Sequence, residues 1–246
     1  MDGRGLDLPR PGAALGMTDL IDTTEMYLRT IYELIEDGVT PMRARIAEQL
    51  GHTGPTVSQT IARMERDGLV VVSPDRHLEL TDEGMAIATR VMRKHRLAER
   101  LLTDVIGLDL PFVHEEACRW EHVMSDRVER RLIEMLGGPQ RSPYGNPIPG
   151  LEELGAIPAT PNLAEVSVFD TLGKNVTYLT LVRIGENPQA LGGFLELASE
   201  IGLVPGTKLT ITGDEDRITL STERGSLSIP ADAARHVFVA SEFVLP

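Results

Sequence analysis

The segment TPMRARIAEQLGHTGPTVSQTIARMERDGL, residues 40–69, decides the fold of the first third of this 246-residue chain. Thr40 followed by Pro41 is typical of a capped helix start, and Gly51 ends that helix. A second helix begins near Thr53. Two helices joined by a short turn at a glycine are typical of a helix-turn-helix motif, whose second helix enters the major groove of DNA. This segment therefore predicts a DNA-binding module.

The residues on both sides of this segment complete a winged module. Upstream, residues 22–37 carry apolar side chains at the spacing of an amphipathic helix. Downstream, LVVVS (69–73) and HLEL (77–80) predict the two short strands of a wing, and Thr81 caps the next helix. We therefore predict a winged helix-turn-helix DNA-binding domain at residues 17–80. The alternative is a small helical packing domain with a hairpin.

The first turn of the second helix of the motif is polar, which favours the DNA-binding interpretation. Small hydroxyl groups there can meet phosphates and thymine methyl groups, and a glutamine can reach a base edge. The net charge of −13 excludes loose binding to nucleic acid over the whole surface, so the contact depends on a local patch. The predicted DNA contacts are Arg43, Thr53, Pro55, Thr56, Ser58, Gln59, Arg63 and Arg66.

The only cysteine of the chain stands among histidines and a glutamate at helical spacing. His114, Cys118, Glu121 and His122 fall on one face of a helix that we predict over residues 113–136. One helical turn separates His95 and Glu99 in a helix predicted over residues 81–102. Imidazole, thiolate and carboxylate donors together suit Fe(II), with Co(II), Ni(II) and Zn(II) as substitutes. An all-oxygen set would have indicated magnesium or calcium.

Each of these residues alone has a structural explanation, and a catalytic one also has to be weighed. We interpret His52, His77 and His236, which stand apart from this pattern, as hydrogen-bonded structural histidines. Cys118 with His122 resembles a thiolate and its base, but the sequence offers no oxyanion hole and no reason for an attached DNA-binding module. A donor set this full also leaves little room for a substrate on the metal. An enzyme is therefore disfavoured.

The rest of the chain is organised around a linker rich in proline and glycine that follows residue 136. Short β-like runs separated by turns begin at about residue 165 and predict a small β-barrel. Residues 1–16, also rich in glycine and proline, predict a disordered extension, and Met17 is an alternative start. One cysteine excludes an internal disulfide, and the N-terminus has no apolar run of signal or membrane length, which predicts a cytoplasmic protein.

Several stretches together resemble the diphtheria toxin repressor family of metal-dependent transcriptional regulators, and within it the mycobacterial-type iron-dependent regulators. The stretches are DTTEMYLRTIY, GPTVSQT, RMERDGL, HLELT, MRKHRLAERLL, EACRWEHVMS, VERRL and SPYGNPIPG, which span residues 17–155. The resemblance implies a mainly α fold with a small β part. A helical dimerisation and metal-binding domain occupies residues 81–156, and an SH3-like β-barrel follows at residues 157–246. The resemblance to the family is looser in this last domain, where it rests on IGENPQ and IGLVPGTKLTI.

The resemblance also implies site residues, position by position. The primary metal site would be Met26, Cys118, Glu121 and His122, with the Leu20 carbonyl acting through a water. The ancillary site would be His95, Glu99 and His114, completed by Glu186 and Gln189 of the third domain. Arg96, Ser142 and Asn146 match positions associated with an anion near the ancillary site.

The function implied is that of a dimeric repressor activated by Fe(II), with two sites per subunit, which represses iron-acquisition genes. Its operator would be double-stranded DNA with an interrupted palindrome. The resemblance also allows activation of iron-storage genes and two dimers on one operator. Relatives that sense manganese replace the methionine and cysteine donors with carboxylates, so Met26 and Cys118 favour iron, with Mn(II) as a further substitute. A manganese-responsive regulator and a metal storage or delivery protein are the alternatives.

Overall fold

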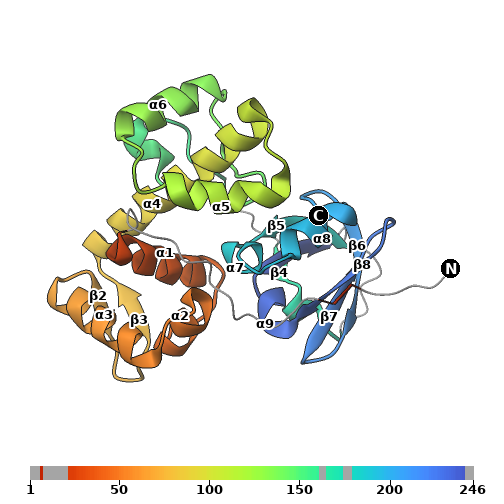
Figure 1. Cartoon of the computed structure of the whole chain (residues 1–246), viewed down its shortest axis with the longest axis horizontal. Helices are drawn as coiled ribbons and strands as arrows, with labels where there is room; N and C mark the ends of the chain where they lie inside the picture. Colours follow the sequence, from red (N-terminus) through yellow and green to blue (C-terminus); the bar gives the residue numbers. More distant parts are fainter. Residues whose placement is uncertain (1–5, 8–21, 161–164, 174–178, 242–246) are drawn as a thin grey trace.

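The computed structural model describes residues 6–7, 22–160, 165–173 and 179–241. The described residues form three parts: an N-terminal helical domain with a two-stranded wing, a second helical domain, and a C-terminal sheet domain (Figure 1). The predicted fold class, mainly α with a small β part, is confirmed. Leu20, predicted to contribute a carbonyl to the primary site, lies outside the described residues. No helix of the described part is long and apolar enough to cross a membrane.

The N-terminal domain contains the predicted winged helix-turn-helix. Its elements are α1 (Thr23–Glu36), α2 (Arg43–Leu50), α3 (Gly54–Arg66), β2 (Val70–Val72) and β3 (Leu78–Leu80). Asp22 caps α1 by accepting hydrogen bonds from the backbone N–H groups of Thr24 and Glu25, and Thr53 caps α3. Three side chains of α3, Val57, Ile61 and Met64, are fully buried in the core of this domain. Burial of one face of α3 leaves its other face to solvent.

The prediction that α2 begins at Pro41 is wrong by two residues. The helix begins at Arg43, with the extended residue Met42 at its N-cap and no side-chain cap. Pro41 is instead tied to the wing, because its carbonyl accepts a hydrogen bond of 3.0 Å from the backbone N–H of Leu78. This contact with β3 holds Pro41 outside the helix.

The second domain is built on α4 (Asp82–Leu101), which Thr81 caps as predicted. Its last turn continues into a π-helical turn at Leu102–Ile106. The single helix predicted over residues 113–136 is wrong, since the structure has two helices, α5 (Leu110–Trp120) and α6 (Asp126–Met135). Ser125 has the extended backbone of an N-cap and begins α6. His122 therefore lies in the turn after α5 and not on its face.

The segment after α6, predicted to be a linker without regular structure, is packed in its middle. It includes a 3₁₀ helix at Leu151–Leu154 and the buried side chains of Tyr144, Asn146 and Ile148. The Tyr144 hydroxyl donates a 2.7 Å hydrogen bond to the carbonyl of Leu110 at the start of α5. Such a segment fixes the sheet domain against the helices rather than tethering it loosely.

The C-terminal domain is a sheet of strand order β1-β8-β7-β6-β5-β9-β4. Its strands are β4 (Val166–Ser167), β5 (Leu179–Ile184), β6 (Lys208–Gly213), β7 (Arg217–Ser221), β8 (Ser226–Pro230) and β9 (Val237–Ser241), all paired antiparallel. A 3₁₀ turn at Phe169–Thr171 and the short helices α7 (Glu186–Gln189), α8 (Phe194–Glu200) and α9 (Ala231–Ala234) complete it. The strand β1 (Leu6–Asp7) pairs parallel with β8, so the predicted disordered extension has regular structure at these two residues.

The cores of the second and third domains are continuous. Four buried residues of the helical domain, Ala98, Leu102, Val113 and Ala117, belong to the same apolar cluster as the inner face of the sheet. α5 also contacts α8 directly. α4 thus packs against α1, and α5 packs against the sheet domain (Figure 1). These two helices carry the predicted metal donors.

Candidate metal centre and DNA-binding face

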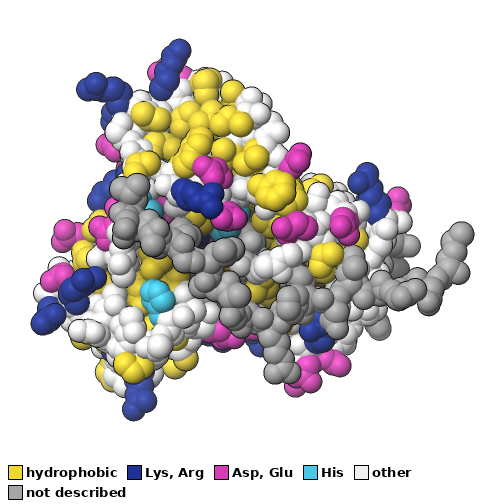
Figure 2. All heavy atoms as spheres, in the orientation of Figure 1, with side chains coloured by type: hydrophobic (Ala, Val, Ile, Leu, Met, Phe, Trp, Pro, Cys, Tyr) yellow, Lys and Arg dark blue, Asp and Glu magenta, His cyan; other side chains and the backbone are white. Residues whose placement is uncertain are grey.

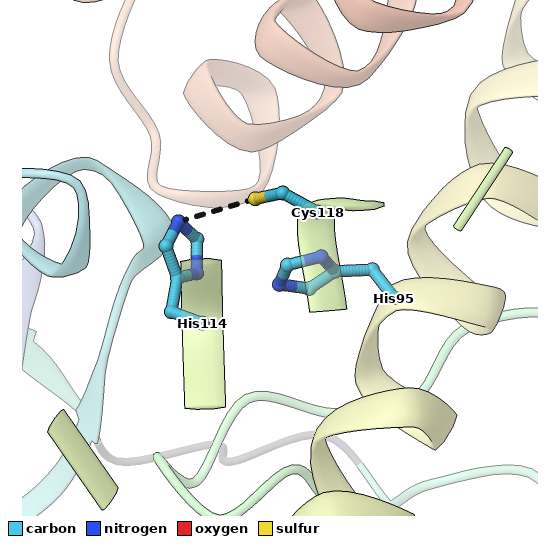
Figure 3. Close-up of side chains that lie close together, drawn as sticks. All are labelled: His95, His114 and Cys118. Carbon is cyan, nitrogen blue, oxygen red and sulfur yellow. Dashed lines mark hydrogen bonds between the residues drawn. The ribbon is translucent and has the colours of Figure 1, made fainter. Parts of the chain in front are cut away.

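His95, His114 and Cys118 form a cluster in which one possible ligand atom of each residue lies within 4.8 Å of the others. His95 comes from α4, whereas His114 and Cys118 stand one turn apart on α5, and the three side chains point toward one another (Figure 3). The Nε2 atom of His114 is 3.6 Å from the Cys118 sulfur. Both imidazoles are buried. The cluster combines residues that were predicted for two separate sites.

Two buried carboxylates extend the cluster. Glu99 lies with one oxygen 2.9 Å from Nε2 of His95, and the same oxygen is 3.6 Å from Nδ1 of His114. Glu121 lies with one oxygen 2.6 Å from Nδ1 of His95. The second oxygen of Glu99 and Nδ1 of His114 are buried without a hydrogen-bond partner among the described residues. Buried ligand atoms without a hydrogen-bond partner fit a divalent cation, which would coordinate them.

Arg29 of α1 is part of this centre, although it was not among the predicted site residues. Its Nη1 atom donates to the Cys118 sulfur at 3.2 Å and lies 2.8 Å from both carboxylate oxygens of Glu121. Its Nε atom donates to Glu33 at 2.6 Å. The one available signal was the spacing of Arg29 and Glu33, which is typical of an exposed ion pair on a helix. Only the fold reveals that this pair is buried against α5.

The charges of the centre balance one another. Burial opposes ionisation of Glu99 and Glu121, but the neighbouring His95 and Arg29, respectively, outweigh it and lower the pKa of each carboxyl to about 2. Burial also opposes the Cys118 thiolate, yet Arg29 and His114 hold its pKa well below the usual value. The surroundings of these three groups therefore favour their ionised forms.

The histidines carry part of the compensating charge. Burial lowers the pKa of an imidazole, but the charge of Glu99 raises the pKa of His95 well above its usual range. At His114, burial also lowers the pKa, but the charge of the Cys118 thiolate outweighs it and raises the pKa to about 9. Protonated imidazoles and Arg29 thus supply the positive charge, and a bound divalent ion would supply it in their place. The donor set of imidazole, thiolate and carboxylate fits a borderline metal such as Fe(II).

The remaining residues of the predicted primary site lie around this centre. The Nδ1 atom of His122 donates a hydrogen bond to Glu25 of α1 at 2.6 Å, and its Nε2 atom is 3.3 Å from Glu121. Met26 packs against the core of the N-terminal domain, and the described contacts do not join its sulfur to Cys118. α1 therefore meets the centre through the residues before and after Met26, namely Glu25 and Arg29.

The residues predicted from the third domain and the anion site have protein partners. Glu186 accepts hydrogen bonds from Arg96 at 2.8 and 2.9 Å, and burial raises the pKa of Glu186 to about 7 although Arg96 opposes this. Gln189 donates to the Ile184 carbonyl, while its own oxygen is buried without a hydrogen-bond partner among the described residues. Ser142 accepts from the backbone N–H of Tyr144.

Arg96 is the centre of this second group. Besides Glu186 it contacts Glu36 of α1 at 2.5 and 2.9 Å and the Pro147 carbonyl. Asn146 donates to the carbonyl of residue 184 at 2.7 Å. The structure thus places Arg96, from α4, between two carboxylates, one from α1 and one from α7, rather than at a free anion position.

The face of α3 predicted to contact DNA is open to solvent. Pro55, Thr56, Ser58, Gln59 and the later arginines of the helix are exposed, opposite its buried face. Thr53 is also exposed, and its hydroxyl is used locally, since it caps the helix and lies 2.8 Å from the Thr56 hydroxyl. Arg63 reaches Thr24 at 3.4 Å, and Arg43 of α2 is half-buried.

Comparison with known proteins identifies the family. Residues 19–78 match the model of the iron dependent repressor N-terminal DNA-binding domain, and residues 81–150 match that of the iron dependent repressor metal-binding and dimerisation domain. The diphtheria toxin repressor of Corynebacterium glutamicum is 54% identical over 91% of this chain and 98% of its own length. The iron-dependent repressor IdeR of Mycobacterium tuberculosis is 54% identical over 79% of this chain and 86% of its own length.

Solved structures agree with this result. The crystal structure of IdeR from T. acidophilum, 27% identical, covers 92% of this chain and all of its own with a TM-score of 0.71. The structure of the manganese regulator SloR, 26% identical, covers 89% of this chain and 98% of its own with a TM-score of 0.69. The relatives of Corynebacterium glutamicum and Mycobacterium tuberculosis are named repressors, and this chain carries the family's DNA-binding domain, so it is a regulator and not an enzyme. The chain therefore belongs to the iron-dependent repressor family and is a metal-dependent, DNA-binding repressor.

Proposed function

We propose that Fe(II) activates this repressor by joining α1 of the DNA-binding domain to α5 of the helical domain. One observation carries the proposal: α1 already contacts the candidate metal donors, through Arg29 with Cys118 and Glu121 and through Glu25 with His122. Any change of charge among those donors therefore acts directly on the first helix of the DNA-binding domain.

The proposed ligands follow the two sites expected from the family. The primary site takes Met26, Cys118, Glu121 and His122, and the ancillary site takes His95, Glu99 and His114 with Glu186 and Gln189. In this structure His95 contacts both Glu99 and Glu121, so the two sites share one buried network. When bound, the divalent ion supplies positive charge that donors from two domains can share. The protonated imidazoles would release their protons and the donors would orient toward one point, which would fix α1 against α5.

Iron is preferred to manganese because of the donor set. Cys118 is a thiolate donor with two imidazoles beside it, and soft or borderline donors of this kind select iron over the harder manganese. The relative of Mycobacterium tuberculosis is named an iron-dependent repressor, whereas a structural neighbour is named a manganese regulator. Parallel titrations with Fe(II) and Mn(II) decide between these metals.

A second copy of the chain is the proposed partner of the helical domain. Figure 2 shows apolar side chains gathered over this domain. Its large apolar side chains that are exposed by about half are Val105, Ile106, Phe112, Val123, Val128 and Met135. An apolar patch on a domain whose family model is a dimerisation domain supports a dimer. Two copies would present two α3 helices about one helical turn apart, which fits an interrupted palindrome as operator. Two dimers on one operator would extend the same arrangement.

The proposed regulation follows from linkage. If the ligated form of α1 presents α3 to DNA better than the metal-free form, metal favours DNA binding, and operator DNA tightens metal binding by the same factor. Iron-acquisition genes are the proposed targets, with iron-storage genes as targets of activation, and the protein acts in the cytoplasm. A storage or delivery protein would use the same ligands but would not prefer a palindrome.

The test is anaerobic fluorescence anisotropy with a labelled interrupted-palindrome operator and a scrambled duplex, first with chelator and then with Fe(II). Selective binding is expected only with Fe(II). Cys118→Ala should abolish the metal response while circular dichroism stays unchanged, and His77→Ala, which removes an imidazole outside the centre, should retain it. A full iron response in Cys118→Ala, or equal binding with and without metal, would refute the proposal.

A further inference from the structure

Arg29 occupies the donor atoms on which the proposed primary site depends. Its Nη1 atom is within 3.2 Å of the Cys118 sulfur and within 2.8 Å of both oxygens of Glu121. Its side chain is only 12% exposed, so water does not screen these contacts strongly. Arg29 is not a plausible metal ligand, because a guanidinium offers only hydrogen-bond donors.

Arg29 and a divalent ion cannot use these atoms together. Both are cations, and both need the lone pairs of the Cys118 sulfur and the Glu121 carboxylate. Two positive charges about 3 Å apart in a buried site repel each other strongly. One of them has to leave, and the guanidinium is the group with a flexible stem.

Arg29 also has a place to go. Its Nε atom already donates to Glu33, one turn further along α1, at 2.6 Å. Glu33 is itself held from α2, because Gln49 donates to its other oxygen at 2.6 Å. When the Arg29 guanidinium leaves Glu121, it keeps the Glu33 carboxylate as its partner. Its movement is therefore coupled, through Glu33, to a contact between α1 and α2, the helix that precedes α3.

We propose that Arg29 is an internal counter-cation that fills the primary metal site of the metal-free chain, so that metal binding requires its displacement toward Glu33. This inference rests on the proposed function, since it takes Cys118 and Glu121 as metal ligands. It adds that the metal-free state is a defined ion-paired state rather than an empty site. It also makes Arg29 a determinant of metal affinity, although it does not contact the metal.

The first experiment measures Co(II) affinity by the thiolate-to-cobalt absorbance band. Arg29→Gln removes the competing charge but can still hydrogen-bond Glu33, so it should bind Co(II) about tenfold or more tightly than the unmodified chain. Arg29→Lys keeps a positive charge but loses the planar fork, so its affinity should fall between the two. Arg131→Gln, which removes an exposed arginine paired with Glu134 on α6, should leave the affinity unchanged.

The second measurement separates competition from a structural role. Without metal, Arg29→Gln leaves Cys118 and Glu121 without their counter-cation, so its melting temperature should fall, and Co(II) should restore it. If Arg29→Gln does not fold without metal, Arg29→Lys is used instead for both the Co(II) affinity and the melting temperature. Unchanged or weaker Co(II) affinity in the Arg29 variants would overturn the inference. A missing thiolate band in the unmodified chain would instead refute the proposed metal site, so the two failures are distinguishable.

Discussion

Replacing Asp37 by alanine should undock the DNA-binding domain from the sheet domain. Asp37 is the C-cap residue of α1, and its carboxylate is 2% exposed. One oxygen accepts a 2.5 Å hydrogen bond from Arg183 of β5, and the other lies 2.7 Å from Nδ1 of His236 before β9. The carboxylate also packs against Gly185, where a Cβ atom would come within 2.6 Å of it. Asp37 thus joins two domains at a close backbone contact.

The magnitude follows from what the alanine leaves behind. Arg183 is 2% exposed and, among the described residues, keeps its ion pair with Glu165 at 2.8 Å. Removing one member of a buried ion pair costs about 3–5 kcal/mol, because the remaining charge stays desolvated. We expect a cost at the lower end, about 3 kcal/mol, because Arg183 keeps its ion pair with Glu165 and its stacking on Phe238. The loss weakens the contact between the DNA-binding domain and the sheet domain, so each domain should itself stay folded.

Urea unfolding combined with hydrogen exchange measures this effect. Asp37→Ala should lower the free energy of unfolding by about 3 kcal/mol, or produce an earlier separate transition, with faster exchange at the end of α1. Asp67→Ala is the matched control, because Asp67 is the C-cap residue of α3 but is exposed, and it should change stability by less than about 0.5 kcal/mol. Equal effects of the two substitutions would refute the reasoning that the buried carboxylate holds the domains together.

Two further predictions concern pH and DNA recognition. The folded pKa of His114, about 9, exceeds its unfolded value near 6.5, so its stabilising contribution is full below pH 6.5 and disappears toward pH 9. The Cys118 thiolate, whose folded pKa lies below its unfolded value, gains stability over the same range and offsets His114. The fall in the melting temperature of the metal-free chain above pH 6.5 should therefore come from His95, whose pKa is also raised, and a profile as steep in His95→Gln would contradict this assignment. Gln59→Ala should weaken binding to the specific operator more than to random DNA in anisotropy titrations, by about 1–3 kcal/mol. Equal losses on both duplexes would mean that Gln59 contacts only the backbone.

Local signals in the sequence predicted the starts of three helices, α1, α3 and α4. Asp22, Thr53 and Thr81 each precede a helix and cap it through a side-chain oxygen, which depends only on residues two or three positions away. The start of α2 was missed because the distant carbonyl contact from the wing, at Leu78, holds Pro41 outside the helix. Local patterns do not contain such a contact.

The sequence contains a signal for the break between α5 and α6, but the prediction of a single helix overlooks it. Ser125 followed by Asp126 is a helix start signal inside an otherwise helical pattern. Treating the stretch as one helix put His122 on the face of Cys118, whereas the structure places His122 in a turn beside Glu25. The cluster of His95, His114 and Cys118 survives this error because its spacing lies within α4 and α5.

Arg29 and Asp37 could not be recognised as site and interface residues from the sequence. Each looks like an ordinary charged residue of a surface helix, since ion pairs spaced by four residues are common there. Arg29 is separated from Cys118 by 89 residues, and Asp37 is separated from His236 by 199. Pairing over such distances is decided by how the domains pack, and one sequence carries no record of it.

The acidic residues of α1 provide a route by which a bound ion would reorganise this protein. They contact basic groups of the other domains or of the metal centre: Glu25 contacts His122, Glu33 contacts Arg29, Glu36 contacts Arg96, and Asp37 contacts Arg183. Charge pairs thus join α1 to α5, α4 and β5, in addition to the apolar packing that α1 shares with Ala88 of α4. Apolar contacts do not respond to a cation, but a buried charge network does, because each new charge changes every pair that shares a partner. A divalent ion at Cys118 and Glu121 would displace Arg29 and thereby alter the contacts of the helix that positions the DNA-binding domain.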